Sequence, residues 1–268
     1  MNRRTALVAL GGAVVGATAT GAGVEVTQAA TRPGPHDPLP FYGGFASAIR
    51  PDLGRPGRAG SGIVWRADRA DRAVALTFDD GPRPDWTPRV LEALAAEEVP
   101  ATFFVKGVNV RDHGALHKDS IGHHEIGNHT WDHPDLARLD LAACTDQITR
   151  TTEAIHAAYG ILPVLFRPPY GHVGGSAVLA AAQAGLTTVF WSAQFREDRY
   201  TDHPAGIVDD VADTVHPGAI VLGHDTGPTV RLVAIDNLRG IIGRLKGMGY
   251  SFHTVSELLS GARPTPGG

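Results

Sequence analysis

The stretch LTFDDGP, residues 76–82, ends an apolar run in two adjacent carboxylates and a tight turn. The apolar run predicts a short buried strand whose last residues lie beside Asp79 and Asp80. A helical pattern over residues 88–99 follows, and a second apolar run, ATFFV, covers residues 101–105. This strand, helix, strand order predicts a parallel sheet covered by helices.

The same alternation continues along the rest of the chain. Further apolar runs are PVLF at 163–166, TTVFW at 187–191 and AIVLGH at 219–224, separated by helical patterns at 141–159, 176–185 and 233–249. A chain of this length can close such a sheet into a (β/α) barrel, where reactive side chains lie at the C-terminal ends of strands. Asp79 and Asp80 occupy such a position.

Composition limits the classes of function. The 268 residues are 43% hydrophobic and 19% charged, which predicts one globular catalytic domain with an N-terminal extension. The formal net charge of −4 offers no basic stripe and argues against nucleic acid as a partner. The single cysteine, Cys144, cannot form an internal disulfide, and we interpret it as a buried structural residue of a helix rather than a catalytic thiol. No pattern indicates an oligomeric state.

The N-terminus indicates export. Arg3 and Arg4 precede an uncharged run, residues 5–24, that is rich in Ala, Gly and Val, which resembles a twin-arginine signal. A membrane anchor is the alternative, but the run is only weakly apolar, so we favour cleavage and expect no stable membrane insertion. We therefore expect residues 1–30 to be an export signal, and the mature protein to be secreted or associated with the cell envelope. Residues 31–60, rich in Pro and Gly, follow as a linker, and residues 61–268 as the catalytic domain.

Two motifs together predict a metal site. Asp-Asp-Gly-Pro is also good turn chemistry, so the carboxylate pair by itself is ambiguous. NHTWDHP places His129 and His133 four residues apart, so that on a helical turn both rings would project from one face; a pair of surface histidines is the alternative. Two histidines and one carboxylate form a ligand set that leaves a position open for water on a divalent ion.

Two further stretches place polar residues after apolar runs. LFRPPYG, residues 165–171, carries Arg167, which can orient a carboxylate, and Tyr170, whose backbone N–H can face a cavity. IVLGHD places His224 at the end of another run. Each could be an ordinary loop or structural residue when taken alone.

In sequence order, TFDDGP, GHHEIGNHTWDHP, FRPPYG and VLGHD resemble the motifs of the polysaccharide deacetylases of NodB-homology type, carbohydrate esterase family 4. The resemblance covers about residues 73–260. It implies a distorted (β/α) barrel of about seven parallel strands and a divalent metal, most often zinc. It also implies hydrolysis of the N-acetyl amide of GlcNAc-containing glycans of peptidoglycan or chitin type, which releases acetate and a free amine.

The resemblance also assigns roles to individual residues. It implies that Asp79 is the general base, that Arg167 orients it, and that His224 is the general acid. It further implies that the metal ligands are Asp80, His129 and His133. The substrate-binding residues that it implies are Tyr170, Trp191 and Leu222, and the Tyr170 N–H is expected to stabilise the developing oxyanion.

One segment departs from the family pattern. WSAQFREDRY, residues 191–200, has Gln194 where one aspartate is common, Glu197 where a second is common and Asp198 where tryptophan is common. Either Glu197 or Asp198 could tune His224. The departure leaves two alternatives open: a weak or inactive glycan-binding homologue, and a deacetylase of O-acetylated or non-sugar N-acyl substrates.

Overall fold

The structure is a computed structural model that describes residues 62–120 and 122–261. The predicted export signal and the predicted linker lie outside these residues. The strands are β1 (Ile63–Val64), β2 (Ala73–Asp79), β3 (Thr102–Val105), β4 (Glu125–Asn128), β5 (Leu165–Phe166), β6 (Thr187–Val189), β7 (Ala193–Gln194), β8 (Ala219–His224) and β9 (Ser251–Phe252). The α-helices are α2 (Thr87–Ala96), α3 (Gly107–His113), α4 (Leu141–Tyr159), α5 (Gly175–Gln183), α6 (Ile207–Thr214), α7 (Leu232–Asp236), α8 (Leu238–Gly247) and α9 (Val255–Ser260).

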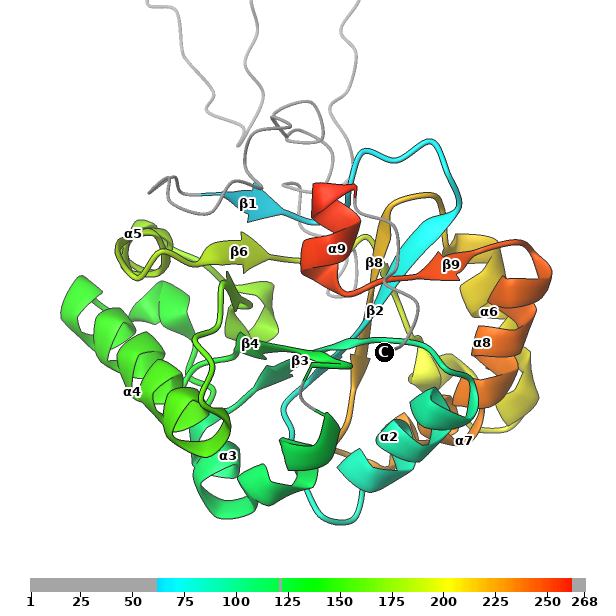
Figure 1. Ribbon diagram of the computed structural model, residues 1–268, viewed down its shortest axis with the longest axis horizontal. Coiled ribbons are helices and arrows are strands. Elements are labelled where there is room, and N and C mark those ends of the chain that lie inside the picture. Colours follow the sequence, from blue (N-terminus) through cyan, green and yellow to red (C-terminus); the bar gives the residue numbers. More distant parts are fainter. Residues whose placement is uncertain (1–61, 121, 262–268) are drawn as a thin grey trace, which may run out of the picture. The chain divides into compact units, whose positions relative to one another are not determined.

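All strands pair in parallel in one sheet of order β1-β6-β5-β4-β3-β2-β8-β7, with β9 pairing β2. The sheet curls into a half-barrel covered by helices, consistent with the expected distorted (β/α) barrel (Figure 1). The described residues form nine strands where about seven were expected. Several of them, such as β1 and β9, contain only two residues, and such short pieces give too weak a pattern to be recognised in the sequence.

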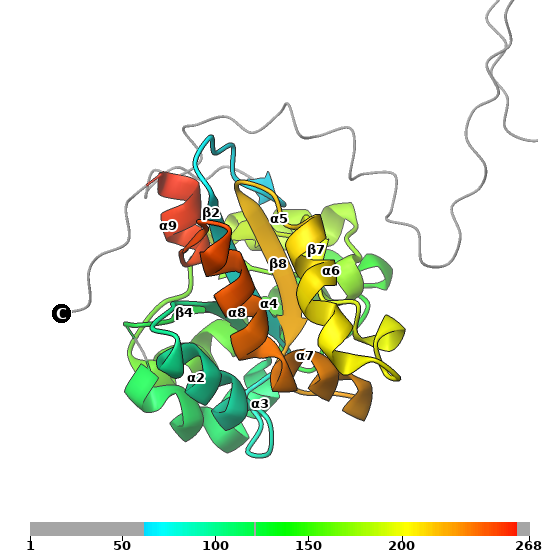
Figure 2. The same cartoon turned by 90° about the vertical axis from the view of Figure 1, so that its right-hand side faces the viewer.

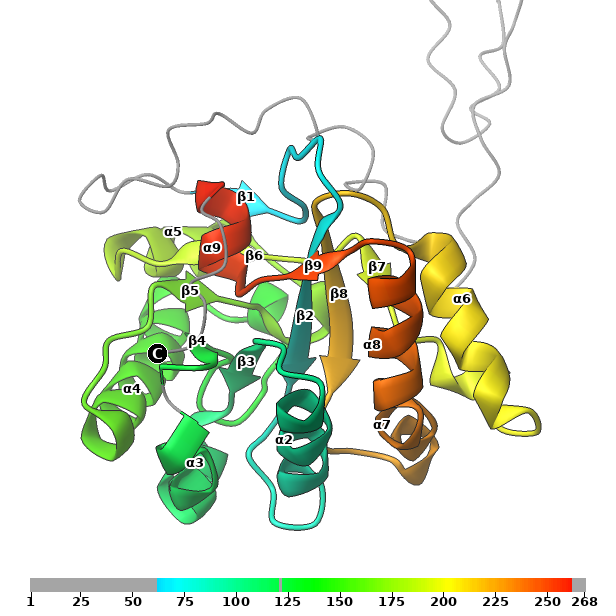
Figure 3. The same ribbon diagram turned by 45° about the vertical axis from the view of Figure 1, so that its right-hand side comes forward.

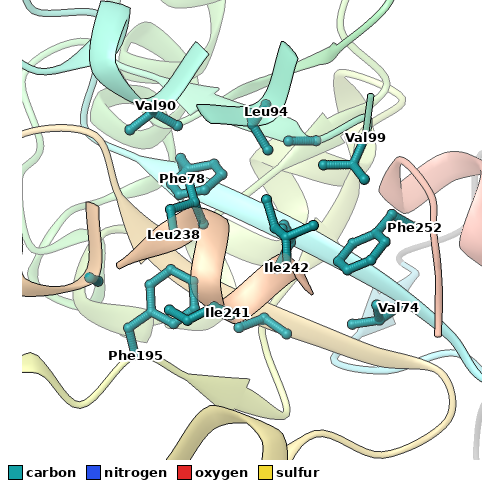
Figure 4. Packing of buried hydrophobic residues seen from close by; sticks show 14 of the residues in the cluster. Val74, Phe78, Val90, Leu94, Val99, Phe195, Leu238, Ile241, Ile242 and Phe252 are labelled. Carbon is teal, nitrogen blue, oxygen red and sulfur yellow. The ribbon is translucent and has the colours of Figure 1, made fainter. Parts of the chain in front are cut away.

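The alternation of side chains along β2 separates the core from the site. Val74, Leu76 and Phe78 lie on one face, in the hydrophobic core beneath α2 and α8 (Figure 4). Thr77 and Asp79 therefore point to the opposite face. Because the whole strand is buried, Asp79 is held in a fixed position at its end.

The pairing of β2 with β8 brings two predicted site residues together. The parallel register aligns Thr77 with Leu222 and Asp79 with His224. In Figure 3 the two strands lie side by side and end at the same side of the sheet. This register places the end of the AVALTFD strand beside the end of the AIVLGH strand, although the paired residues Asp79 and His224 are 145 positions apart in the chain.

The helices mostly follow the sequence pattern. Helix α4 covers 141–159 as predicted, with Asp140 capping its start and Gly160, at φ 71°, ending it. The single helix predicted for 233–249 is wrong, because Asn237 interrupts it and its side chain bonds the Val233 carbonyl. Helices α8 and α6 flank β8 on the face shown in Figure 2.

Within residues 62–120 and 122–261, none of the helices combines the length and the apolar character needed to span a bilayer. Cys144 is buried on α4, where the sequence placed it.

Candidate active site

The carboxyl ends of four strands gather the predicted catalytic and metal-binding residues. Asp79 ends β2 and His224 ends β8, while His129 follows β4 directly and Arg167 follows β5 directly. The backbone N–H of Arg167 donates to Asn128 O at 2.9 Å, which aligns the two strand ends. These residues come from distant parts of the sequence and meet because parallel strands share one C-terminal edge.

Arg167 fixes one oxygen of Asp79. Its side chain is fully buried, and Nη1 donates to Asp79 Oδ1 and to Thr77 Oγ1, both at 2.7 Å. Its other nitrogens donate to the carbonyl oxygens of Val189 and Phe190, at 3.2 and 3.1 Å. A buried guanidinium requires such partners, because an unpaired charge is costly there. This is the contact that the predicted orienting role requires.

Asp80 leaves the strand in a left-handed turn. Its φ of 81° is unusual for a residue other than glycine and turns its side chain away from the path of the strand. Asn109 Nδ2 donates to its carbonyl oxygen at 2.7 Å, and the next N–H, of Gly81, donates to Asp225 Oδ1 at 2.9 Å. A Cβ at Gly81 would lie 2.0 Å from Asp225 Oδ2, so the turn requires glycine.

The predicted helical turn at His129 and His133 is wrong. The segment after β4 is a loop in which Thr130 and His133 both have φ of 69°. Side chains hold this loop: Asn128 Oδ1 accepts from Thr130 N at 2.9 Å, and Thr130 Oγ1 accepts from His133 N at 3.1 Å. Local side-chain bonds of this kind compete with helical hydrogen bonds. The two rings nevertheless converge, with centroids 5.0 Å apart.

Asp80, His129 and His133 form a cluster with the spacing of a metal site. Asp80 Oδ1 lies 3.7 Å from His129 Nε2 and 3.3 Å from His133 Nε2. Ligand atoms around a tetrahedral zinc ion are separated by about 3.3 Å, given bonds of about 2.0 Å. His129 Nδ1 contacts Arg167 O at 2.7 Å, which directs Nε2 into the cluster. The donor set and its spacing therefore fit a divalent cation.

The protonation states suit metal binding as well. Burial, and then the neighbouring His129, lowers the pKa of His133 to about 4, so its ring is neutral at neutral pH. Burial alone would raise the pKa of Asp80, but the nearby histidines His129, His224 and His133 hold it below the usual range. Neutral imidazole and ionised carboxylate are the forms that ligate metals.

The second oxygen of each carboxylate has a different partner. Asp79 Oδ2 lies 3.8 Å from His129 Nε2, so it faces the cluster while Oδ1 is held by Arg167. Asp80 Oδ2 instead accepts a hydrogen bond from Arg231 Nη1 at 2.9 Å. Each carboxylate thus has one oxygen held by an arginine and one oxygen turned toward the histidines.

The predicted substrate-binding residues lie at different depths. Tyr170 is 60% exposed, adopts φ 59°, and its ring lies edge-on to His133 with centroids 4.5 Å apart. Trp191 is half-buried, and its Nε1 donates to Gln194 Oε1 at 3.0 Å. Leu222 is buried on β8, aligned with Gln194 of β7. Of the three, Tyr170 contacts a residue of the metal cluster directly.

In the segment that departs from the family pattern, the two acids Glu197 and Asp198 differ in burial. Glu197 is buried, and burial raises its pKa to about 7, whereas Asp198 is exposed. Burial, followed by the charge of Arg231, lowers the pKa of His224 to about 3. Its ring is therefore neutral near pH 7, and a role as general acid requires negative charge on the substrate beside it.

The sequence motifs did not indicate two residues of the site, Asp225 and Arg231. Asp225 stands inside the motif VLGHD, yet its role in holding Gly81 and Thr87 follows only from the fold. Arg231 has no motif to indicate it, since it lies seven residues beyond His224 in the chain and 151 residues from Asp80. Only the tertiary contact reveals it.

Comparisons with known proteins agree with this geometry. Residues 66–189 match the sequence profile described as polysaccharide deacetylase. The chain is 37% identical over 192 residues to the peptidoglycan-N-acetylglucosamine deacetylase of Listeria monocytogenes, an alignment that covers 71% of this chain and 39% of that relative. The chain therefore spans well under half of the length of that relative.

A shorter relative is matched over most of its length. The chitooligosaccharide deacetylase of Bradyrhizobium sp. is 38% identical over 199 residues, which is 70% of this chain and 90% of the relative. Among solved structures, a CE4 family pseudoenzyme from Bacillus anthracis superposes with a TM-score of 0.69 at 29% identity, covering 76% of this chain and 71% of that one.

Proposed function

The chain belongs to the polysaccharide deacetylase (CE4) family, and from this premise we propose that it is a metal-dependent N-deacetylase of GlcNAc-containing glycans of peptidoglycan or chitooligosaccharide type. The observation that carries the proposal is the set of strand-end residues around one point, Asp79 with Arg167 and the cluster of Asp80, His129 and His133. The substrates in the names of the relatives from Listeria and Bradyrhizobium support the choice of glycan.

Asp80, His129 and His133 would hold the cation, which we propose to be Zn²⁺. When bound, such an ion supplies Lewis acidity that polarises the acetyl carbonyl and makes water more acidic. The three protein donors leave room for other ligands, which structural zinc sites with four protein ligands do not.

Asp79 would act as the general base. Its Oδ2 faces the metal-binding histidines, and Arg167 keeps Oδ1 fixed, so the free oxygen can take a proton from water as the water oxygen bonds the acetyl carbon. The backbone N–H of Tyr170 would stabilise the charge that develops on the carbonyl oxygen. The hydrogen bonds of the turn are made by the next two N–H groups, of Gly171 and His172, which donate to Pro168 O and Pro169 O.

Negative charge that develops on the bound substrate would favour a protonated His224, which would then deliver its proton to the departing nitrogen. The register of β2 and β8 places His224 beside Asp79. Asp79 can therefore accept a proton from water while His224 donates a proton to the nitrogen of the same amide. As the C–N bond breaks, this proton converts the nitrogen into a free amine, and the acyl part leaves as acetate.

Acetate release by the purified chain tests the proposal. We expect release from GlcNAc oligomers or peptidoglycan that disappears after treatment with a chelator and returns with Zn²⁺. Release from acetylated xylan or from a simple N-acyl amine, but from neither glycan, would favour the O-acetyl or non-sugar alternative.

A glycan-binding homologue without turnover is the second candidate. It is favoured by the likeness to the Bacillus anthracis pseudoenzyme and by the altered segment at 191–200. Glycan binding with no acetate release from any acetylated substrate, in a chain loaded with zinc, would establish it.

We also propose that the protein acts outside the cytoplasm. The composition of residues 1–30 and the polymeric nature of the proposed substrates support this location. Fractionation of the source cells, with N-terminal sequencing of the extracellular form, tests it. A mature protein that begins near residue 31 is expected, and one that retains residues 1–30 in the cytoplasm would contradict the proposal.

A further inference from the structure

Arg231 binds the proposed metal ligand Asp80 on the oxygen that the histidines do not face. Its Nη1 donates to Asp80 Oδ2 at 2.9 Å, and both side chains are largely shielded from solvent. Asp80 Oδ1 points the other way, toward His133 Nε2 at 3.3 Å. The carboxylate is therefore held at one end while its other end completes the metal cluster.

Contacts other than the one with Asp80 also hold the Arg231 side chain in place. Nη1 donates to Thr226 O at 2.7 Å in addition to Asp80. Gly227, at φ 129°, lies against the guanidinium, since a Cβ at this position would be 2.4 Å from Nη1. The backbone N–H of Arg231 donates to Pro228 O at 3.0 Å and fixes the turn from which the side chain leaves. The position of Arg231 is thus determined independently of Asp80.

We propose that Arg231 is a positioning residue that occupies Oδ2 of Asp80 and so makes Asp80 a ligand through Oδ1 alone. Carboxylates bind metals through one or both oxygens, and a second oxygen on the ion would use a position otherwise open to water or substrate. The inference rests on the metal site of the proposed function. The role resembles that of Arg167, which holds one oxygen of Asp79 as Arg231 holds one oxygen of Asp80.

Two effects of Arg231 on metal affinity have opposite signs. Its positive charge repels a cation bound nearby, so through charge alone its removal would tighten metal binding. Its hydrogen bond orients the ligand, so through positioning its removal would weaken metal binding, and loss of such an outer partner typically costs about 10–100-fold in affinity. The direction of the change therefore separates positioning from a simple charge effect.

The measurement is Zn²⁺ affinity of the full chain, stripped of metal and titrated against a chromophoric chelator. We expect Arg231→Met to lose about 10–100-fold in affinity. Arg231→Lys should recover part of the loss, because an ammonium can donate to Oδ2 but lacks the planar fork with which the guanidinium is held against Thr226 O. Gly227→Ala, whose added Cβ would have Arg231 atoms as its three nearest neighbours, should also weaken binding because that Cβ displaces the guanidinium.

Arg239→Met is the matched control. It removes the same charge from an exposed side chain that contacts Glu97 instead of the site, and we expect zinc affinity within about two-fold of wild type. Unchanged or tighter binding by Arg231→Met would overturn the inference.

A crystal structure of the zinc-loaded wild type tests the same claim without a variant. One Asp80 oxygen on zinc with Arg231 on the other supports the inference, and both oxygens on zinc overturn it. A wild-type chain that binds no zinc would contradict the proposed function itself, whereas strong binding with Asp80 bidentate would contradict only the role of Arg231.

Discussion

At the scale of single residues, the adjacent carboxylates Asp79 and Asp80 differ in backbone and partner. Asp79 continues the strand and shares a face with Thr77, where buried Arg167 reaches both. Asp80 turns away at φ 81°, which aims its side chain at the histidines. Adjacent positions can therefore supply a proton acceptor and a metal ligand, because one change in backbone conformation separates their side chains.

Neutralising each carboxylate in turn should separate the two roles. Asp79→Asn is expected to lower the rate of acetate release by about 10²–10⁴-fold, the usual contribution of a general base, while zinc affinity stays within a few-fold. Asp80→Asn is expected to lower zinc affinity by more than about 100-fold, because it weakens one of three ligands. Acetate assays and zinc titrations on both variants check this. Equal zinc losses in the two variants would contradict the division of roles.

At the scale of elements, Asp225 ties the turn after β2 to the start of α2. Its two oxygens accept from Gly81 N at 2.9 Å and from Thr87 Oγ1 at 2.6 Å, and its own N–H donates to Asp79 O at 3.2 Å. Burial, and the charge of Asp80, raise the pKa of Asp225 to about 7. The end of β8 therefore supports the turn that presents Asp80.

Thr87→Val removes the hydroxyl from this connection at nearly constant volume. We expect the free energy of unfolding to fall by about 1–3 kcal/mol, since a buried carboxylate loses a donor and the Arg83 N–H loses its acceptor. Chemical denaturation measures the change. Thr149→Val, at an exposed position of α4, is the control and should change stability by less than about 0.5 kcal/mol. A similar effect at both positions would contradict the role of this connection.

The short segment after β7 contains a carboxyl group that opposes folding at high pH. The pKa of Glu197 is raised by burial from 4.5 to about 7, so its contribution to stability is complete below pH 4.5 and is lost as pH rises through 7. At pH 8 we expect Glu197→Gln to be more stable than wild type, with a free energy of unfolding higher by up to about 3 kcal/mol. At pH 4.5 the two proteins should differ little in stability.

Denaturation of Glu197→Gln at the two pH values tests this, with Asp198→Asn as the control. Asp198 is the neighbouring acid and is exposed, so its neutralisation should leave the pH dependence of stability as in wild type. A gain at pH 8 in both variants would attribute the effect to surface charge instead.

At the scale of the whole molecule, buried neutral histidines should make the domain sensitive to acid. His117 is fully buried beside Phe103, with ring centroids 4.5 Å apart, and burial lowers its pKa from 6.5 to about 4. His124 is also buried against Phe103, with ring centroids 5.4 Å apart, and burial lowers its pKa to about 3. Below pH 6.5 the unfolded chain binds protons that the folded chain excludes.

Stability from His117 is complete above pH 6.5 and is lost as pH falls toward 4, at up to about 1.4 kcal/mol per pH unit. His117→Leu should reduce the slope of unfolding free energy against pH between 6 and 5 by about that amount. Denaturation series at several pH values measure the slope. An unchanged slope in this variant would show that other groups cause the acid sensitivity.

The elements of this fold were predictable where their pattern was long. Strand β2 is a seven-residue, fully buried apolar run and helix α4 is long enough to show the 3.6-residue period, and both agree with the sequence prediction. Two-residue strands such as β1 and β9 show no period. The break at Asn237 is a local hydrogen-bonding choice that apolar spacing does not reveal.

The sequence by itself determined the family, the parallel α/β architecture and the types of residue at the ends of the strands. These follow from motifs and hydrophobic periodicity, which are properties of neighbouring residues. Only the tertiary structure decided that His129 and His133 converge from a loop, that Asp225 holds the turn at Gly81, and that Arg231 binds Asp80. The physical reason is that hydrogen bonds depend on distances between atoms. For residues 144 or 151 positions apart, strand register and backbone dihedrals set those distances.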